Sequence, residues 1–324
     1  MPRGIWSRYT ELPICRQTVG VYRANCPITT FGANLSTSRE ERCARNDDEV
    51  AAPPPRRGDL DRPAVHGPGR DAALGRGVLT MGWDALAQWG GGAVRIEPLS
   101  GGVANDVWSV RVNGRLAVAR LGTRSHADLA WETGLLQYLD RAGLTVPVPI
   151  PTTDGRPFAD GLVVMRYLEG GPPETEADWR RVADTLRELH RLTQNWPQRP
   201  GWRSSTELLH AKTGTRINLA AMPAEGVARC RAAWVRLVGR PTCVVHGNPT
   251  NPGNIRMTAD RVALIDWDES HVDAPDLDLA LPHNAANLDD VAHDIAAQAS
   301  AAWEAAVCWK DDYAVQRLAE VRAV

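Results

Sequence analysis

The sequence lacks the features of a membrane-spanning or secreted protein. No run approaches the roughly 20 consecutive apolar residues that a helix needs to cross a bilayer. The segment after Met1 has no apolar stretch leading to a small-residue cleavage site, so no secretory leader is predicted. The formal net charge is only −2, which draws the chain neither to nucleic acid nor to an anionic membrane. We therefore expect a cytoplasmic protein with no nucleic-acid or membrane partner.

Metal-binding cysteine spacing is also missing. None of the six cysteines forms a C-x-x-C pair, and no cluster of histidine and cysteine has the spacing of a zinc site. We therefore interpret them as reduced thiols without a metal. Phenylalanine is scarce, with two residues against twelve tryptophans, and we expect the tryptophans to serve core packing.

Regular periodicity is absent from the first eighty residues. They contain the proline- and arginine-rich run Ala51–Gly58 and the glycine-rich run His66–Arg70. Such a segment cannot bury enough apolar surface to offset the entropy lost on ordering, so residues 1–80 are predicted to be disordered. A sharper hypothesis makes them foreign to the natural product, with translation starting at Met81. An intact mass that includes residues 1–80 in natively expressed protein would exclude this hypothesis.

Ordered patterning begins near residue 93 with the signals of an antiparallel sheet. Three strands are predicted, at residues 94–96, 107–112 and 116–121. Asn113 and Gly114 separate the last two, and this pair forms a favoured two-residue hairpin turn because both positions accept positive φ. Apolar residues at helical spacing then predict a helix over Leu129–Leu139, which ends at Gly143.

The chain then returns to the sheet and passes into a helical region. Residues 162–165 form a buried strand pattern, whereas the proline-rich residues 146–151 fit an edge strand or a loop. Glu169–Pro173 has the composition of a linker. Beyond it, helices are predicted after a capping box at Thr175–Asp178, over Pro223–Val238 and from Asp289 onward, with short strands at residues 243–245, near 255 and at 262–265.

The most informative stretch is a polar loop between two of these strands. Val245–Ile255 reads VHGNPTNPGNI, and Leu264–Trp267 reads LIDW. The first segment leads from an apolar strand into a proline- and glycine-rich loop, and the second is a strand that ends in a carboxylate. Asn254 and Asp266 are therefore expected to converge at one end of a hairpin. A carboxylate and an amide oxygen are suitable ligands for Mg²⁺, which keeps several waters and uses substrate phosphates.

These residues resemble the catalytic and metal-binding segments of the aminoglycoside phosphotransferase and choline kinase family. Its loop reads H-G-D-x-x-x-x-N and its metal carboxylate lies in I-D-[WF], the counterparts of two protein-kinase motifs. His246 and Gly247 match the opening of the loop. The resemblance implies that Asn254 and Asp266 hold magnesium and that Asp278, in a D-L-A match, has a structural role.

The resemblance implies an α+β, protein-kinase-like fold with two lobes. Residues 81–168 would form the N-lobe, a small antiparallel sheet with one helix that covers the nucleotide. Residues 169–324 would form a mainly helical C-lobe with the catalytic loop and the metal site. ATP would occupy the cleft, and the expected activity is transfer of its γ-phosphoryl group to a hydroxyl of a small molecule.

Three features upstream extend the resemblance to the phosphate end of the nucleotide. Ser100, Gly101 and Gly102 stand where the family has its phosphate-covering turn, although two glycines between strands can be only a turn. Arg120 stands where kinases place the lysine for the α- and β-phosphates, and Glu132 where its ion-pair partner lies. The alternative makes this pair a surface arginine and an exposed helix glutamate.

Departures from the family at two places, the catalytic loop and Arg120, bear on activity. Asn248 replaces the catalytic aspartate, and a neutral amide accepts a hydrogen bond but cannot take a proton. The interval from Asn248 to Asn254 is also one residue longer than the motif, with the surplus around Pro249–Asn251. Arg120 in place of lysine keeps the charge but presents a planar fork instead of a compact ammonium group.

Three functions therefore remain open. The first is a phosphotransferase impaired at Asn248, the second an inactive, nucleotide-binding pseudokinase-type module, and the third an unrelated α+β binding protein. His246 is interpreted as a packed loop anchor and His190 as a helix-surface or lobe-packing residue. Downstream carboxylates could line a pocket for a cationic acceptor or be solvated surface charges, namely Asp268, Glu269, Asp289, Asp290 and Asp294.

Overall fold

The computed structural model describes residues 82–99, 105–214, 216–309 and 311–323. These residues fall within one compact unit of the chain. The predicted disorder of residues 1–80 and the proposed start at Met81 lie outside the described residues.

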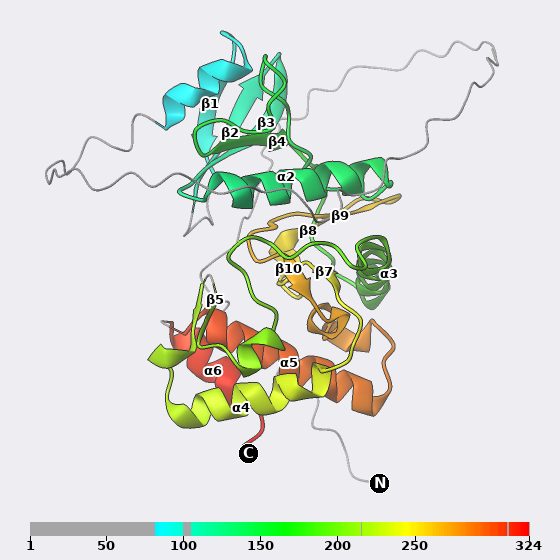
Figure 1. Cartoon of the computed structure of the whole chain (residues 1–324). Coiled ribbons are helices and arrows are strands. Elements are labelled where there is room, and N and C mark those ends of the chain that lie inside the picture. The colour runs from blue at the N-terminus through cyan, green and yellow to red at the C-terminus, as the bar shows by residue number, and fades with distance from the viewer. Residues whose placement is uncertain (1–81, 100–104, 215, 310, 324) are drawn as a thin grey trace, which may run out of the picture. The chain divides into compact units, whose positions relative to one another are not determined.

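An antiparallel four-stranded sheet in the order β1-β2-β3-β4 forms the first part of the described chain (Figure 1). Its strands are β1 (Val94–Pro98), β2 (Asp106–Val112), β3 (Arg115–Leu121) and β4 (Leu162–Arg166). Asn113 and Gly114 have φ of 50° and 76°, the positive values that this two-residue turn requires. The predicted hairpin is therefore confirmed.

Helix α2 (His126–Arg141) lies along one face of this sheet (Figure 1). Ser125 caps it, because its hydroxyl accepts a hydrogen bond from the backbone N–H of Asp128 at 3.2 Å. Leu129 packs against the sheet, while the leucines of the next turns join the core of the helical part of the chain. The opposite face of the sheet is covered by a 3-10 helix, Trp83–Trp89, which the sequence analysis did not predict.

The segment between α2 and β4 has no regular strand. Val148 and Ile150 nevertheless hydrogen-bond to β4, since Ile150 N–H donates to Val164 (2.7 Å) and Val148 O accepts from Arg166 (2.9 Å). This is the irregular edge that its prolines predicted. After β4 the linker runs against a later strand, where Gly171 N–H donates to Met257 O at 3.1 Å.

The rest of the described chain is mainly helical. Its α-helices are α3 (Glu176–Leu192), α4 (Ala224–Trp234), α5 (Asp290–Val307) and α6 (Asp312–Glu320). Thr175 and Asp178 form the predicted capping box at the start of α3. Helix α4 ends four residues before the predicted Val238, where a 3-10 turn, Val235–Leu237, continues it. Helix α5 packs against both α4 and α6 (Figure 1).

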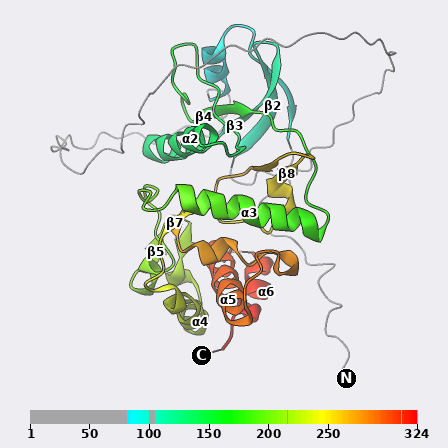
Figure 2. The same ribbon diagram turned by 90° about the vertical axis from the view of Figure 1, so that its right-hand side faces the viewer.

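Short strand pairs support the loops of the helical part. They are β5 (Thr213–Gly214) with β6 (Ile217–Asn218), β7 (Cys243–Val245) with β10 (His271–Asp273), and β8 (Ile255–Met257) with β9 (Val262–Leu264). Helix α3 packs against β7 (Figure 2) and also against β9. Helix α3 therefore holds β7 directly and β8 through its partner β9. The loop between β7 and β8 carries the motif.

Tryptophan fills much of the core, as expected. Trp89, Trp234, Trp267 and Trp303 are fully buried. Cys230, Cys243 and Cys308 are buried cysteines outside any disulfide, and burial raises the pKa of Cys230 to about 12. Among the described residues no helix is long and apolar enough to cross a membrane.

Candidate functional site

The loop after β7 is held in place by Asp278. Its carboxylate accepts hydrogen bonds from the backbone N–H of His246 (2.7 Å) and of Gly247 (3.0 Å), and lies 2.9 Å from Nε2 of His190. Burial alone would raise the pKa of Asp278, but these hydrogen bonds and the nearby histidines hold it below its usual range. Asp278 thus has the structural role that the resemblance implied, and His190 is a buried packing residue.

Two features give the loop its direction. Gly247 has φ of 94°, and a Cβ at this position would lie 2.6 Å from the backbone oxygen of Glu269, so only glycine fits. Nε2 of His246 donates to the carbonyl oxygen of Ile265 at 2.9 Å. Burial lowers the pKa of His246, and its ring stacks edge-on against Trp267. His246 is therefore the packed loop anchor predicted for it.

The longer loop is accommodated by a local cap. Asn251 caps a 3-10 turn, Pro252–Asn254, and its side-chain oxygen accepts from the backbone N–H of Gly253 at 2.9 Å. Asn254 then turns back, and its Nδ2 donates to the backbone oxygen of Asn248 at 2.9 Å. The cap accommodates the extra residue within the loop, and a hydrogen bond joins Asn248 and Asn254 across it.

Asn254 and Asp266 lie at the same end of the β8–β9 hairpin. Asn254 directly precedes β8, and its carbonyl oxygen accepts from the N–H of Ile265 at 2.8 Å, one residue before Asp266. Asp266 has φ of 63°, an uncommon conformation for a residue other than glycine and a frequent one at functional sites. The backbone therefore brings together the two residues predicted to bind metal.

The donor set at this end of the hairpin fits magnesium. Nδ2 of Asn254 donates to the backbone oxygen of Asn248, so the amide oxygen is the atom of this side chain that can serve as a ligand. Among the described residues no three His, Cys, Asp or Glu side chains cluster as a complete metal cage. One carboxylate and one amide oxygen suit an ion that takes its other ligands from water and phosphate.

Arg120 and Glu132 form a buried ion pair between β3 and α2. Arg120 also lies 2.5 Å from Oδ1 of Asp268, and Oδ2 of that carboxylate accepts from Asn105 at 2.6 Å. Burial would lower the pKa of Arg120, but Asp268, Glu132 and Asp266 raise it. The alternative of a surface arginine with an exposed glutamate is therefore wrong, whereas the phosphate-binding role of Arg120 stays a prediction.

Sequence reasoning missed two further arginines of this cluster. Arg124 and Arg199 both reach Glu132, with Nη2 of Arg199 at 3.1 Å. Burial alone would raise the pKa of Glu132, but its three arginines hold it well below its usual range. Arg124 follows β3 directly and could have been suspected, whereas Arg199, from a loop after α3, carries no local signal. Ser100, Gly101 and Gly102 lie outside the described residues.

The downstream carboxylates do not gather into one pocket. Asp268 belongs to the Arg120 cluster. Asp289 caps α5 by accepting from the N–H of Ala292 at 2.8 Å. Asp294 pairs with Arg236 at 2.7 Å. A pocket for a cationic acceptor, if formed, would thus use only part of this set.

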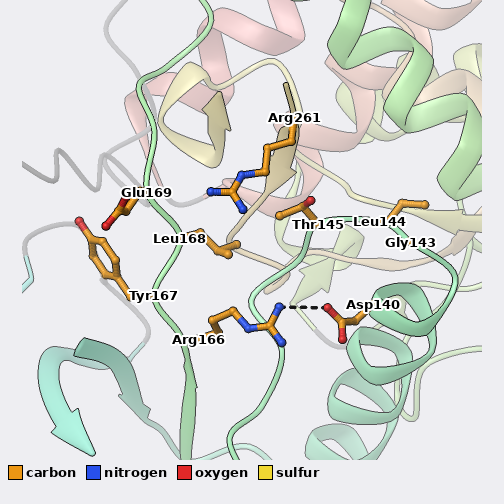
Figure 3. Close-up of a pocket in the computed structure, with 9 residues that line it drawn as sticks. All are labelled: Asp140, Gly143, Leu144, Thr145, Arg166, Tyr167, Leu168, Glu169 and Arg261. Carbon is orange, nitrogen blue, oxygen red and sulfur yellow. Dashed lines mark hydrogen bonds and ion pairs between the residues drawn. The ribbon is translucent and has the colours of Figure 1, made fainter. Parts of the chain in front are cut away.

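A cavity of about 280 Å³ lies beside the linker, and none of the residues predicted for the site lines it (Figure 3). It is lined by Asp140, Gly143, Leu144, Thr145, Arg166, Tyr167, Leu168, Glu169 and Arg261. Arg166 and Asp140 are joined by an ion pair of 3.1 Å across it. Arg166 is exposed and Asp140 only half-buried, so this pair contributes little to stability.

Residues 95–314 match the profile of the phosphotransferase enzyme family, which is more than half of the chain. The chain belongs to this family. The resemblance predicted from residues 245–267 is confirmed, and the matched region of this phosphotransferase-family chain contains Arg120, Glu132, Asn248, Asn254 and Asp266.

Relatives of this phosphotransferase-family chain include a homoserine kinase from Beijerinckia indica. It is 28% identical over 213 residues, which cover 60% of this chain and 65% of the relative's length. A choline kinase from Streptococcus pneumoniae has a similar structure, with TM-score 0.53, 15% identity, and coverage of 75% of this chain and 96% of its own. The ternary complex of streptomycin, ATP and APH(2")-IIa gives TM-score 0.51, 14% identity, and coverage of 76% and 97%. These structures confirm the predicted α+β, protein-kinase-like fold.

Proposed function

We propose that the protein transfers the γ-phosphoryl group of ATP to a hydroxyl of a small molecule. The proposal rests on one observation. The carbonyl oxygen of Asn254 accepts from the N–H of Ile265, next to Asp266, beside a loop that opens with His246 and Gly247. Membership of the phosphotransferase enzyme family supports it. In this proposal residues 81–168 form the nucleotide-covering lobe and residues 169–324 the lobe with the metal site, in a cytoplasmic protein.

In the proposed site, the residues would contact the metal or the phosphates according to their charge. Asp266 and Asn254 would hold Mg²⁺, which neutralises charge on the phosphates when bound. Arg120 would meet the α- and β-phosphates, with its orientation fixed by Glu132. Ser100, Gly101 and Gly102 would cover the phosphates with backbone N–H groups. Most of the barrier in phosphoryl transfer is lowered by such positioning and electrostatic stabilisation.

Asn248 would face the acceptor hydroxyl. It can accept a hydrogen bond from that hydroxyl and so orient it, but it cannot take the proton. General-base catalysis is worth roughly 10²–10⁴ in rate. Against about 1–100 s⁻¹ for kinases, a base-less enzyme would turn over at roughly 10⁻⁴–1 s⁻¹. We therefore propose a slow phosphotransferase.

A second candidate is a pseudokinase-type module that binds nucleotide without turnover. Asn248 favours it, because the amide stands where the family has its base. The longer loop also favours the pseudokinase. Asn251 caps a turn within the loop, so the extra residue is part of its folded form and can displace Asn248 from the position of the family's base. A transfer assay with γ-³²P-ATP decides between the two when the natural chain is compared with Asn248→Asp combined with deletion of Thr250. Activity in both proteins supports the enzyme, and activity only in the repaired protein supports the pseudokinase.

Nucleotide binding itself separates both candidates from an unrelated binding protein. Mg-ATP at 100 times its Kd should stabilise the folded protein by about 2.7 kcal/mol, which a thermal shift detects. Asp266→Asn should weaken this shift when Mg²⁺ is present. No shift for the unaltered chain over a wide range of Mg-ATP would contradict the proposal.

The acceptor class is best searched among hydroxylated small molecules. The relatives are named for homoserine and choline, and a structural neighbour was solved with streptomycin. All three molecules carry a free hydroxyl together with a cationic nitrogen. A panel built on these compounds, read by ADP release, tests the acceptor directly.

A further inference from the structure

The Arg199 side chain lies where α2 meets the segment after Asp266. It is fully buried, which is costly for a guanidinium group unless its donors are satisfied. Nε donates to Asp128 at 2.5 Å and Nη2 to Glu132 at 3.1 Å, both on α2. Nη1 lies 2.9–3.2 Å from the carbonyl oxygens of Trp267, Asp268 and Ser270. One side chain thus bridges α2 and this segment.

The orientation of this guanidinium is fixed as well as its place. Trp131 and Trp202 lie against it, with ring centroids 5.4 and 5.0 Å from its central carbon. Cation–π contacts of this kind strengthen when water is excluded. Arg199 therefore cannot turn to another set of partners without losing contacts on every side.

The two groups that Arg199 joins belong to the two halves of the proposed site. Glu132 is the partner of Arg120, which is assigned to the phosphates. The carbonyl groups that Nη1 approaches begin one residue after Asp266, which is assigned to the metal. On the basis of the proposed function, we propose that Arg199 is a positioning residue that sets the Asp266 strand end and the Glu132–Arg120 pair in register with each other.

A lysine at this position would keep the charge and lose the bridge. Its ammonium group is a compact point charge with three donors, and it cannot reproduce the planar fork that contacts α2 and residues 267–270 together. Arg199→Lys therefore tests positioning separately from charge. A merely stabilising arginine would lower the melting temperature on substitution and leave metal affinity unchanged.

The experiment measures Mn²⁺ binding by electron paramagnetic resonance, with a non-hydrolysable ATP analogue present. Mn²⁺ accepts the same oxygen ligands as Mg²⁺. Residues that orient metal ligands typically change metal affinity by about 10–100-fold when replaced, and we expect a loss in this range for Arg199→Lys. Affinity for the analogue without metal should change far less. The matched control is Arg231→Lys, because Arg231 also donates to backbone carbonyls, those of Leu208 (3.2 Å) and Ala211 (3.0 Å), outside the site.

The outcomes separate this inference from the proposed function. If the unaltered protein binds no Mn²⁺ with the analogue, the proposed function fails and the inference fails with it. If it binds and Arg199→Lys binds equally well, or if Arg231→Lys is weakened as much, only the positioning role is overturned. Should Arg199→Lys not fold, Asp128→Ala removes the acceptor of the Nε hydrogen bond and should weaken Mn²⁺ binding in the same direction. Unchanged binding in that variant would overturn the inference.

Discussion

At the scale of single residues, Glu132 is the carboxylate that three arginines share. Its one carboxylate contacts Arg120, Arg124 and Arg199, and its side chain is 1% exposed. Burial costs each arginine much of its hydration, and the attraction to this shared charge is one of the terms that offset the cost. The cluster is therefore sensitive to loss of the carboxylate and less sensitive to loss of any one arginine.

Glu132→Gln should destabilise the folded protein by about 3–5 kcal/mol, because it removes the charge that three arginines share and leaves only Asp268 and Asp128 to compensate them. Urea denaturation followed by circular dichroism measures the change. Glu188→Gln is the control, since Glu188 pairs with Arg191 on the exposed face of α3, and its denaturation midpoint should not move. A loss below about 1 kcal/mol for Glu132→Gln would show that water reaches the cluster.

At the scale of structural elements, the loop after β7 depends on a close approach of two backbones. Gly247 and Gly239 both have positive φ, 94° and 82°. A Cβ at Gly247 would meet Glu269, whereas nothing lies within 4 Å of one at Gly239. The two glycines therefore separate the cost of the backbone conformation from the cost of contact.

Gly239→Ala should cost about 1–2 kcal/mol, the penalty of the left-handed conformation alone. Gly247→Ala should cost more than this and should also weaken Mg-ATP binding, because relief of the contact moves the loop that carries Asn248. Denaturant unfolding and thermal shift with Mg-ATP measure the two effects. Equal losses for the two variants would show that the loop adapts without strain.

Elements with local signals could be predicted from the sequence, and contacts across the chain could not. The turn at Asn113 and the capping box at Thr175 follow from residues only a few positions apart. The motif at residues 245–267 revealed the loop and the Asp266 strand end in the same way. Arg199 and Asp268 were missed as partners because charged residues in loops are usually solvated, and their partners Glu132 and Arg120 lie 67 and 148 positions away.

At the scale of the whole molecule, two buried carboxylates make stability depend on acid. The pKa values of Glu132 and Asp278 are lowered in the folded state. Their unfolded values are close to the ordinary ones, about 4.3 for Glu and 3.9 for Asp. As pH falls below about 4, the unfolded chain takes up protons that the folded protein does not, so these groups stabilise the fold above that range and lose their contribution below it.

The free energy of unfolding should therefore fall steeply between about pH 4 and pH 2, by up to about 1.4 kcal/mol per pH unit for each group. Guanidinium denaturation at a series of pH values measures this slope. Asp278→Asn should be less stable at neutral pH and should show a shallower slope in acid. An unchanged slope in this variant would mean that Asp278 titrates normally.

The buried thiols of the helical part offer a means of timing its motions. Cys230 lies on α4 with its thiol directed at the backbone oxygen of Ala302 on α5, and Cys243 is the first residue of β7. Because burial raises the pKa of both thiols, neither reacts with an alkylating reagent until its surroundings separate. The rate of alkylation at each cysteine then reports local opening, at Cys230 between α4 and α5 and at Cys243 in the strand that leads into the loop carrying Asn248, with no foreign probe attached.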